Sequence, residues 1–114
     1  MPGISSVFFG SLDDNIFREC ADAGIKLLEI SFGSCEASDS VDFLRAKRLV
    51  EESGVKLWSF HIPFSPFVMV DPSFTDEEKR RYTVGKFCGY IRCAVDAGIG
   101  IAVIHASGEP VTEE

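Results

Sequence analysis

The two histidines of this 114-residue sequence occupy similar positions in its pattern. His61 closes the apolar run of "VKLWSFHIPF", and His105 closes the apolar run of "IAVIHASGEP". An imidazole can hold or move a proton near neutral pH, and its ring nitrogens ligate metal ions. If both runs are strands, both imidazoles lie at strand carboxyl ends, where open α/β sheets bind their ligands. We therefore expect His61 and His105 to lie close enough to serve one ligand.

Three further side chains are candidates for the same site. Glu29 interrupts the apolar run "LLEISF", and because Glu is almost never buried unpaired, it faces either a polar mouth or the point where the strand leaves the core. Phe64 and Phe67 lie in "FSPFVMVDPSF", which is too long for a structural turn, and we expect them to line a ligand pocket. Trp58 and Phe60, in contrast, are expected to be core residues of a strand.

A repeated helix and strand pattern positions these residues. The segments "ECADAGIKLLEI", "VEESGVKLWSF" and "AVDAGIGIAVIH" each run from a helical ending through a glycine into an apolar strand. Gly24, Gly54 and Gly98 fit the position just after a helix, where the left-handed conformation favours glycine. The sequence predicts strands at 4–9, 26–32, 56–62 and 101–105, and helices at 15–23, 41–53 and 76–97.

Strands that alternate with helices pair in parallel through right-handed crossovers. We expect a single α/β domain over residues 1–114, in the order βαβαβαβ, with strand order 1-2-3-4 and three helices on one face. The last helix is predicted to begin with a capping box of Thr75 and Glu78. Apolar spacing predicts the inward faces of the last two helices, which would carry Phe43, Leu44, Ala46, Val50, Val84, Phe87, Cys88, Ile91, Ala94 and Val95.

Composition limits the partners and the location. Eleven Lys and Arg against eighteen Asp and Glu give a net charge of -7, which disfavours nucleic acid because phosphate contact needs a segregated basic face. The N-terminal region predicts no signal peptide and no membrane span, so the cytoplasm is the expected location. Cys20, Cys35, Cys88 and Cys93 form no CxxC pair, and we expect reduced thiols packed in the core.

The repeated segments, with "HIPF" and "DPS", resemble the N-terminal half of the xylose isomerase-like TIM-barrel superfamily, which includes sugar phosphate isomerases and epimerases and the endonuclease IV enzymes. The resemblance covers this chain and about half of an eight-unit barrel, and it implies a half TIM barrel of four strands and three helices. In the family, histidines that end strands three and four face the active-site mouth. His61 and His105 match them, and Glu29 matches an acidic residue that ends strand two.

This resemblance implies a metal-assisted isomerase or epimerase that transfers a proton on a keto sugar or sugar phosphate, with Mn, Mg or Zn as cofactor. In the sugar isomerases the matching histidines contact the substrate, and in endonuclease IV they ligate zinc. The principal metal ligands and the phosphate site of the family lie on strands five to eight, which this chain does not contain. We therefore expect the chain alone to be inactive, with a minimal metal site or none.

Other interpretations stay open. The two imidazoles could be structural groups hydrogen-bonded within the core or loops. The chain could be a zinc abasic-site nuclease, although its acidic balance counts against this, or a non-catalytic half-barrel that serves as a dimer or binding module. Four strands of an unclosed barrel expose an inner face and two edges. We therefore expect a homo-oligomer, or the remainder of a longer chain, to cover them.

Overall fold

The computed structural model describes residues 1–9, 12–31, 35–39, 41–66 and 68–106, and the statements below concern these residues. Three of the elements are short: β1, the 3-10 helix η1 and β4. The order along the chain is β1 (Gly3–Ser5), η1 (Ser6–Phe8), α1 (Asp14–Asp22), β2 (Leu27–Ile30), α2 (Cys35–Asp39), α3 (Phe43–Ser53), β3 (Lys56–His61), α4 (Glu77–Asp96) and β4 (Ala102–Val103).

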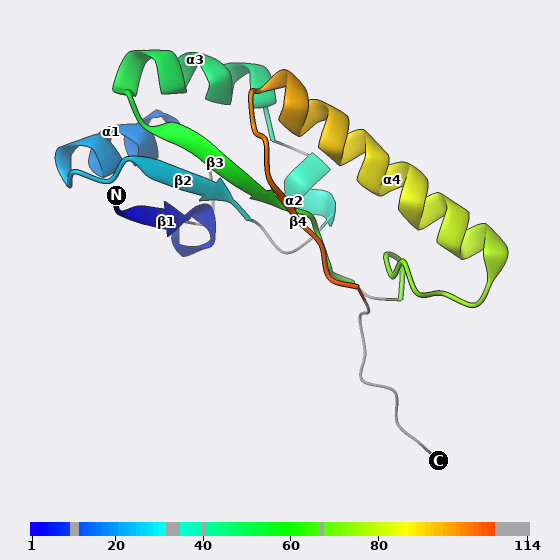
Figure 1. Ribbon diagram of the computed structural model, residues 1–114. Coiled ribbons are helices and arrows are strands. Elements are labelled where there is room, and N and C mark those ends of the chain that lie inside the picture. Colours follow the sequence, from blue (N-terminus) through cyan, green and yellow to red (C-terminus); the bar gives the residue numbers. More distant parts are fainter. Residues whose placement is uncertain (10–11, 32–34, 40, 67, 107–114) are drawn as a thin grey trace.

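The four strands form one all-parallel sheet in the order β1-β2-β3-β4. Helices α1, α3 and α4 pack against one face of this sheet (Figure 1). The predicted α/β fold and its strand order are therefore confirmed. The short helix α2, between β2 and α3, is an addition that the sequence pattern did not predict.

The helix-covered face of the sheet carries the hydrophobic core. Leu28, Ile30 and Phe60 are fully buried there. The Phe60 ring meets the rings of Phe43 and Tyr90 edge-on, with centroids 5.4 and 6.0 Å apart, a favourable aromatic arrangement. On the opposite face, here called the open face, no helix of the described residues packs (Figure 1). Its side chains include those of Ser5, Leu27, Glu29, Lys56, Trp58, Ser59 and His61.

The three glycines predicted to follow helix ends have positive φ angles. Gly24, Gly54 and Gly98 have φ values of 74°, 72° and 83°, the region in which a Cβ is disfavoured. The start of α4 differs from the prediction, because its N-cap is Asp76 and not Thr75. The Asp76 carboxylate accepts hydrogen bonds from the backbone N–H groups of Glu78 and Lys79, both at 3.0 Å.

The predicted strand at 4–9 is wrong beyond Ser5. Ser6 is fully buried, and its Oγ accepts from the backbone N–H of Ser31 at 2.8 Å and donates to the carbonyl of Ser31 at 3.1 Å. This side chain takes the place of a backbone strand pair, and the chain turns into η1. Val7 and Phe8 are consequently exposed.

The inward face of α4 is rotated by about one residue from the prediction. Phe87 and Ala94 are buried as expected, but the buried row is completed by Thr83 and Tyr90. The prediction counted only apolar residues and so missed two that carry a hydroxyl. Val84, Cys88 and Val95 are exposed instead, as is Leu44 of α3.

The cysteines do not form a common core. Cys20 is buried, and this burial raises the pKa of its thiol and keeps it neutral. Cys88 and Cys93 are exposed free thiols on α4, so the expectation that they are core residues is wrong. The side chain of Cys35 lies outside the described residues.

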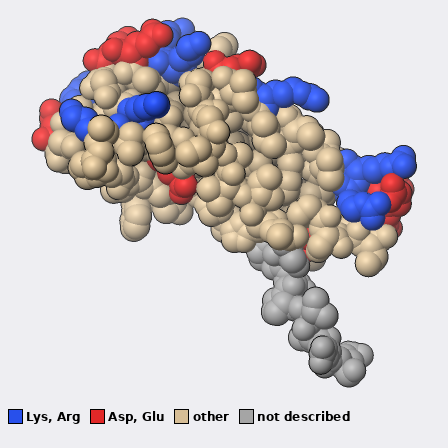
Figure 2. Space-filling view, viewed as in Figure 1, with Lys and Arg blue, Asp and Glu red and all other residues tan. Residues whose placement is uncertain are grey.

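Charged side chains gather over the helices. In Figure 2 they cluster over α3 and at the start of α4. At the start of α4, both Arg80 and Arg81 pair with Glu77 one turn earlier. The positive charge of these two arginines is thus partly neutralised within their own helix.

Candidate functional site

The two histidines meet at the carboxyl edge of the sheet. His61 is the last residue of β3, and His105 follows β4 by two residues. Their Nε2 atoms lie 3.0 Å apart, and their rings are stacked with centroids 5.1 Å apart and an interplanar angle of 12°. At this distance one Nε2 carries a hydrogen and the other accepts it. The structure thus brings together the pair that the sequence predicts at one edge.

Glu29 lies behind this pair. Its Oε1 is 3.9 Å from Nδ1 of His61, within ion-pair reach but longer than a hydrogen bond. Its Oε2 accepts a 2.9 Å hydrogen bond from the hydroxyl of Ser59. The carboxylate is therefore held in place by Ser59 while it faces the far nitrogen of His61. The sequence pattern gave no signal for Ser59.

A β-bulge in β3 orients these side chains. Leu28 of β2 pairs with Leu57, but the next residue, Glu29, pairs with Ser59, so Trp58 is skipped. Trp58 and Ser59 both face the open side, where both line the hollow described below. Phe60 then returns to the core. Strict alternation would have placed the following His61 on the helix-covered face.

Phe64 covers the histidine pair from the loop that follows β3. Its ring centroid lies 4.5 Å from that of His105 and 5.6 Å from that of His61. The loop is anchored by the buried residues Ile62 and Pro63. Phe64 thus lies beside the two histidines, and its role in lining a ligand pocket stays a prediction, whereas Phe67 lies outside the described residues.

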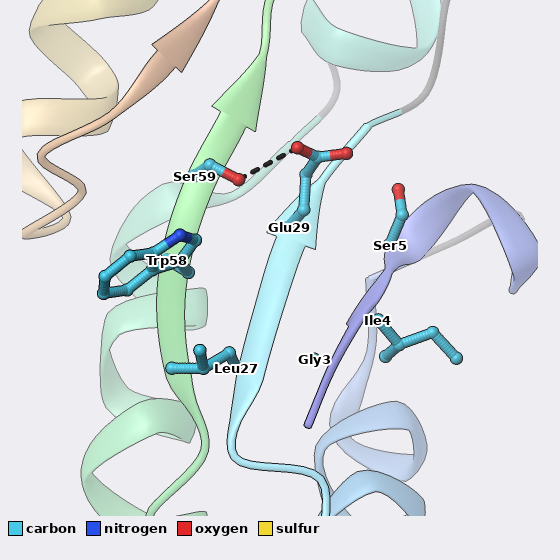
Figure 3. A pocket seen from close by; sticks show the side chains of 7 residues that line it. All are labelled: Gly3, Ile4, Ser5, Leu27, Glu29, Trp58 and Ser59. Carbon is cyan, nitrogen blue, oxygen red and sulfur yellow. Dashed lines mark hydrogen bonds between the residues drawn. The ribbon is translucent and has the colours of Figure 1, made fainter. Parts of the chain in front are cut away.

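A hollow of about 270 Å³ adjoins Glu29 on the open face. Trp58 forms part of its wall and is 46% exposed, so the expectation that this residue is core is wrong for this chain. Figure 3 shows the side chains of the hollow rising from three neighbouring strands. They are those of Gly3, Ile4, Ser5, Leu27, Glu29, Trp58 and Ser59.

The histidine pair fits part of a metal site. Two imidazoles on one tetrahedral zinc ion have nitrogens about 3.3 Å apart, close to the 3.0 Å between the two Nε2 atoms. Glu29 lies on the Nδ1 side of His61, where carboxylates orient a ligating histidine. Within the described ranges, no group of three or more His, Cys, Asp or Glu side chains is placed to hold a metal. The chain therefore offers two ligands.

The segments that follow the strands are acidic. Residues 6–13, 31–42, 62–76 and 104–114 contain no Lys or Arg, although they contain several Asp and Glu. The carboxyl ends of parallel strands share one edge of the sheet. Where these segments are described, they therefore bring no Lys or Arg to this edge of the sheet, which favours cations or uncharged ligands over anions.

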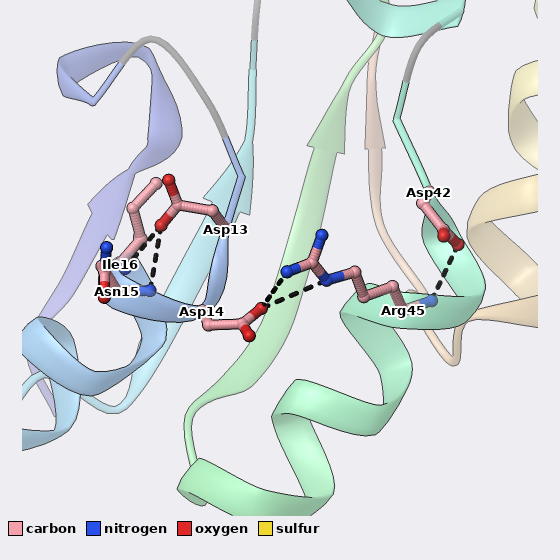
Figure 4. Close-up of polar contacts among 6 residues, drawn as sticks. All are labelled: Asp13, Asp14, Asn15, Ile16, Asp42 and Arg45. Atoms are coloured by element: carbon pink, nitrogen blue, oxygen red, sulfur yellow. Dashed lines mark hydrogen bonds and ion pairs between the residues drawn. The ribbon is translucent and has the colours of Figure 1, made fainter.

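Polar contacts between the helices hold the framework of the sheet. Arg45 of α3 donates to Oδ1 of Asp14 of α1 from Nε at 3.1 Å and Nη2 at 2.6 Å (Figure 4). Asp13 and Asp42 cap the two helices by accepting backbone N–H hydrogen bonds. These contacts join α1 to α3, the two helices that precede β2, which carries Glu29, and β3, which carries His61.

Comparison with protein-family models, curated proteins and solved structures finds no match. None of the helices in the described part of the chain is long and apolar enough to cross a membrane.

Proposed function

We propose that this chain forms half of the active site of a metal-assisted isomerase or epimerase that acts on an uncharged keto sugar. The carrying observation is the pair of Nε2 atoms of His61 and His105, 3.0 Å apart, with Glu29 facing the far nitrogen of His61. Four further strands, from a second copy or from more of the polypeptide, complete the barrel. The resemblance to the xylose isomerase-like superfamily supports the same proposal.

The histidine pair matches the oxygens of an α-hydroxy ketone. In the pair, one Nε2 donates and the other accepts. A substrate that replaces this hydrogen bond presents a carbonyl oxygen to the donor and a hydroxyl to the acceptor. When a base removes the proton from the carbon that bears this hydroxyl, the electron pair moves to the carbonyl oxygen, where the Nε2–H holds the enediolate charge. Return of the proton to the opposite face of the same carbon gives the epimer. Return of the proton to the former carbonyl carbon gives the isomer, provided that the acceptor Nε2 takes the hydroxyl proton and the donor Nε2–H gives its own proton to the former carbonyl oxygen.

The remaining parts of the site are divided between this chain and the completing strands. In the substrate complex a divalent cation, which when bound polarises the sugar oxygens, would be held by ligands on the completing strands, because an Nε2–H that donates to the substrate cannot ligate a metal. With no sugar bound, His61 and His105 would serve as two ligands of a divalent cation when both rings carry their hydrogen on Nδ1. Glu29 is a positioning residue that orients the ring of His61. The base that transfers the proton comes from the completing strands.

The charge of the mouth supports an uncharged substrate. A phosphorylated sugar or a DNA backbone needs Lys or Arg on the loops around the site, and the segments that follow the four strands contain none. This observation disfavours the abasic-site nuclease.

The test uses the protein expressed from its complete reading frame. A panel of uncharged and phosphorylated keto sugars is incubated with Mn²⁺ in D₂O, and NMR follows deuterium incorporation next to the carbonyl. We expect incorporation into an uncharged keto sugar, a large loss in His61→Ala and His105→Ala, and no loss in the control Tyr82→Ala, an exposed residue on α4. Absence of exchange in every sugar overturns the proposal, and cutting of abasic duplex in zinc buffer would replace it with the nuclease.

A further inference from the structure

We infer that the hollow beside Glu29 binds the hydroxylated tail of an uncharged sugar, with Trp58 as its apolar platform and Glu29 and Ser5 as its hydrogen-bonding groups. The inference rests on the proposed function only for the position of the reacting end of the sugar. Binding of the tail itself requires no catalysis, so the two can fail separately.

Small side chains create the room for a ligand. The hollow is bordered by Gly3, Ser5 and Ser59, whereas bulky branched residues normally fill the interior of such a barrel. A Cβ on Gly3 would lie 3.1 Å from Cβ of Leu27 and 3.2 Å from its carbonyl oxygen. Glycine therefore lets β1 approach β2 closely while it leaves the space above them empty.

Trp58 supplies a large apolar surface on one wall. The bulge turns its indole to the open face, where 46% of the residue is exposed. Nζ of Lys56 lies over one face of this indole, 5.7 Å from the ring centroid, so a ligand would pack on the other face. An exposed indole next to hydrogen-bonding groups suits a ligand with both C–H faces and hydroxyls, which is the chemistry of a sugar.

A row of polar groups crosses three strands at the other side of the hollow. Ser5, Glu29 and Ser59 are register partners on β1, β2 and β3 (Figure 3). Oε2 of Glu29 accepts from Ser59, while Oε1 lies 3.9 Å from His61, too far for a hydrogen bond. The Oγ of Ser5 is buried without a hydrogen-bond partner among the described residues.

A buried hydroxyl without a partner raises the free energy of the folded state. A ligand hydroxyl that donates to Oε1 of Glu29 and accepts from Ser5 satisfies both groups. An anionic ligand would instead meet the carboxylate of Glu29, so the row selects uncharged polyols.

The position of the hollow fits the direction of the substrate. His61 follows Ser59 by two residues toward the carboxyl end of β3, so the hollow lies deeper along the strands than the histidine pair. A keto sugar with its tail over Trp58 places its carbonyl end at the imidazoles.

Trp58 is itself a reporter, because it is the only tryptophan of the 114 residues. We would titrate the protein with D-fructose and D-xylulose, with myo-inositol as a polyol that lacks a carbonyl, and with cyclohexanol as a ring that carries one hydroxyl. Tryptophan emission and saturation-transfer NMR follow binding. We expect saturable changes with the three polyols and none with cyclohexanol. No saturable signal from any polyol, or an equal one from cyclohexanol, overturns the inference.

Variants separate the contacts. Glu29→Gln keeps the shape but removes the charged acceptor, and we expect affinity for myo-inositol to fall about tenfold or more. Leu27→Phe fills the hollow and is expected to abolish binding, while Tyr82→Ala, an exposed aromatic outside the hollow, leaves affinity unchanged. Circular dichroism checks the fold of each variant. If both hollow variants bind myo-inositol with the affinity of the wild type, the inference is wrong. If neither variant folds, the wild-type titration decides it.

The result also separates this inference from the proposed function. Polyol binding without deuterium exchange in any keto sugar leaves the binding site standing and overturns the catalytic proposal. Exchange with a KM that Leu27→Phe does not change overturns the binding site and leaves the catalytic proposal standing.

Discussion

Tyr90 of α4 donates a 2.6 Å hydrogen bond to the carboxylate of Asp39 in α2. Lys86, one turn earlier on α4, contacts the same carboxylate at 2.9 Å. The hydrogen bond from Tyr90 and, next, that from Lys86 lower the pKa of Asp39 from its ordinary value of 3.8. This contact ties the short helix that the sequence did not predict to the longest helix of the chain.

The lowered pKa makes part of the stability depend on pH. Because the folded pKa of Asp39 lies below its unfolded value, its stabilising effect is present above about pH 4 and is lost as pH falls through the folded pKa. We expect Tyr90→Phe to unfold at lower urea concentration than wild type at pH 6, and the difference to shrink toward pH 2. Tyr82→Phe, an exposed tyrosine on the same helix, is the control. A difference that stays constant with pH would contradict this.

The structure assigns the N-cap of α4 to Asp76, whereas the sequence predicts Thr75. Asp76 satisfies two backbone N–H groups at the start of α4, and loss of an N-cap destabilises a helix. We expect Asp76→Ala to lower the melting temperature by about 5 °C and Thr75→Ala to leave it nearly unchanged. Calorimetry on both variants decides. If Thr75→Ala lowers the melting temperature more than Asp76→Ala does, Thr75 is the N-cap and the capping box forms after all.

The imidazole pair should bind Co²⁺, whose visible spectrum reports nitrogen ligands. Because the two Nε2 atoms lie 3.0 Å apart, we expect His61→Ala and His105→Ala each to weaken Co²⁺ binding strongly when no sugar is present. Cys93→Ser, an exposed thiol on α4, is the matched control and should not change it. Equal spectra for all variants would mean that any bound Co²⁺ lies elsewhere.

The open face and the edge strand β4 should drive association. Val103 and Ile104 are 38% and 46% exposed, and burial of a large side chain contributes about 1.5–3 kcal/mol. We expect sedimentation equilibrium at micromolar concentration to show a dimer or a higher oligomer. Val103→Lys in β4 should shift the protein toward monomer, because a charge on an edge strand opposes pairing.

Val95→Lys is the control for this experiment. Val95 is 62% exposed on α4, away from the sheet edge, and its substitution should leave the mass unchanged. A stable wild-type monomer would mean that the open face is covered in another way.

The parallel sheet was predictable because its signals are local. A glycine after a helix followed by an apolar run recurs three times, and such units have one favoured handedness and pairing. The adjacency of His61 and His105 followed from the same repeat. Phe64 could be placed near them because it directly follows the end of β3.

What could not be predicted depends on contacts between distant residues. Ser6 ends β1 by hydrogen bonding to Ser31, twenty-five residues away. Tyr90 is buried where α4 meets Asp39 of α2 and Phe60 of β3, although its hydroxyl suggests exposure. The hydrogen bond between Ser59 and Glu29 requires the bulge, which depends on the partner strand.

The same bulge lets the core contacts of β3 and the polar groups on its open face vary separately. Leu57 and Phe60 face the core, and the two residues between them, Trp58 and Ser59, both face the open side. Removal of Ser59 would leave Leu57, Trp58, Phe60 and His61 in strict alternation on their present sides. The strand could thus lose or gain a polar residue toward the ligand without moving its core contacts. Substrate preference could therefore change by insertion or deletion at this one position, independently of folding.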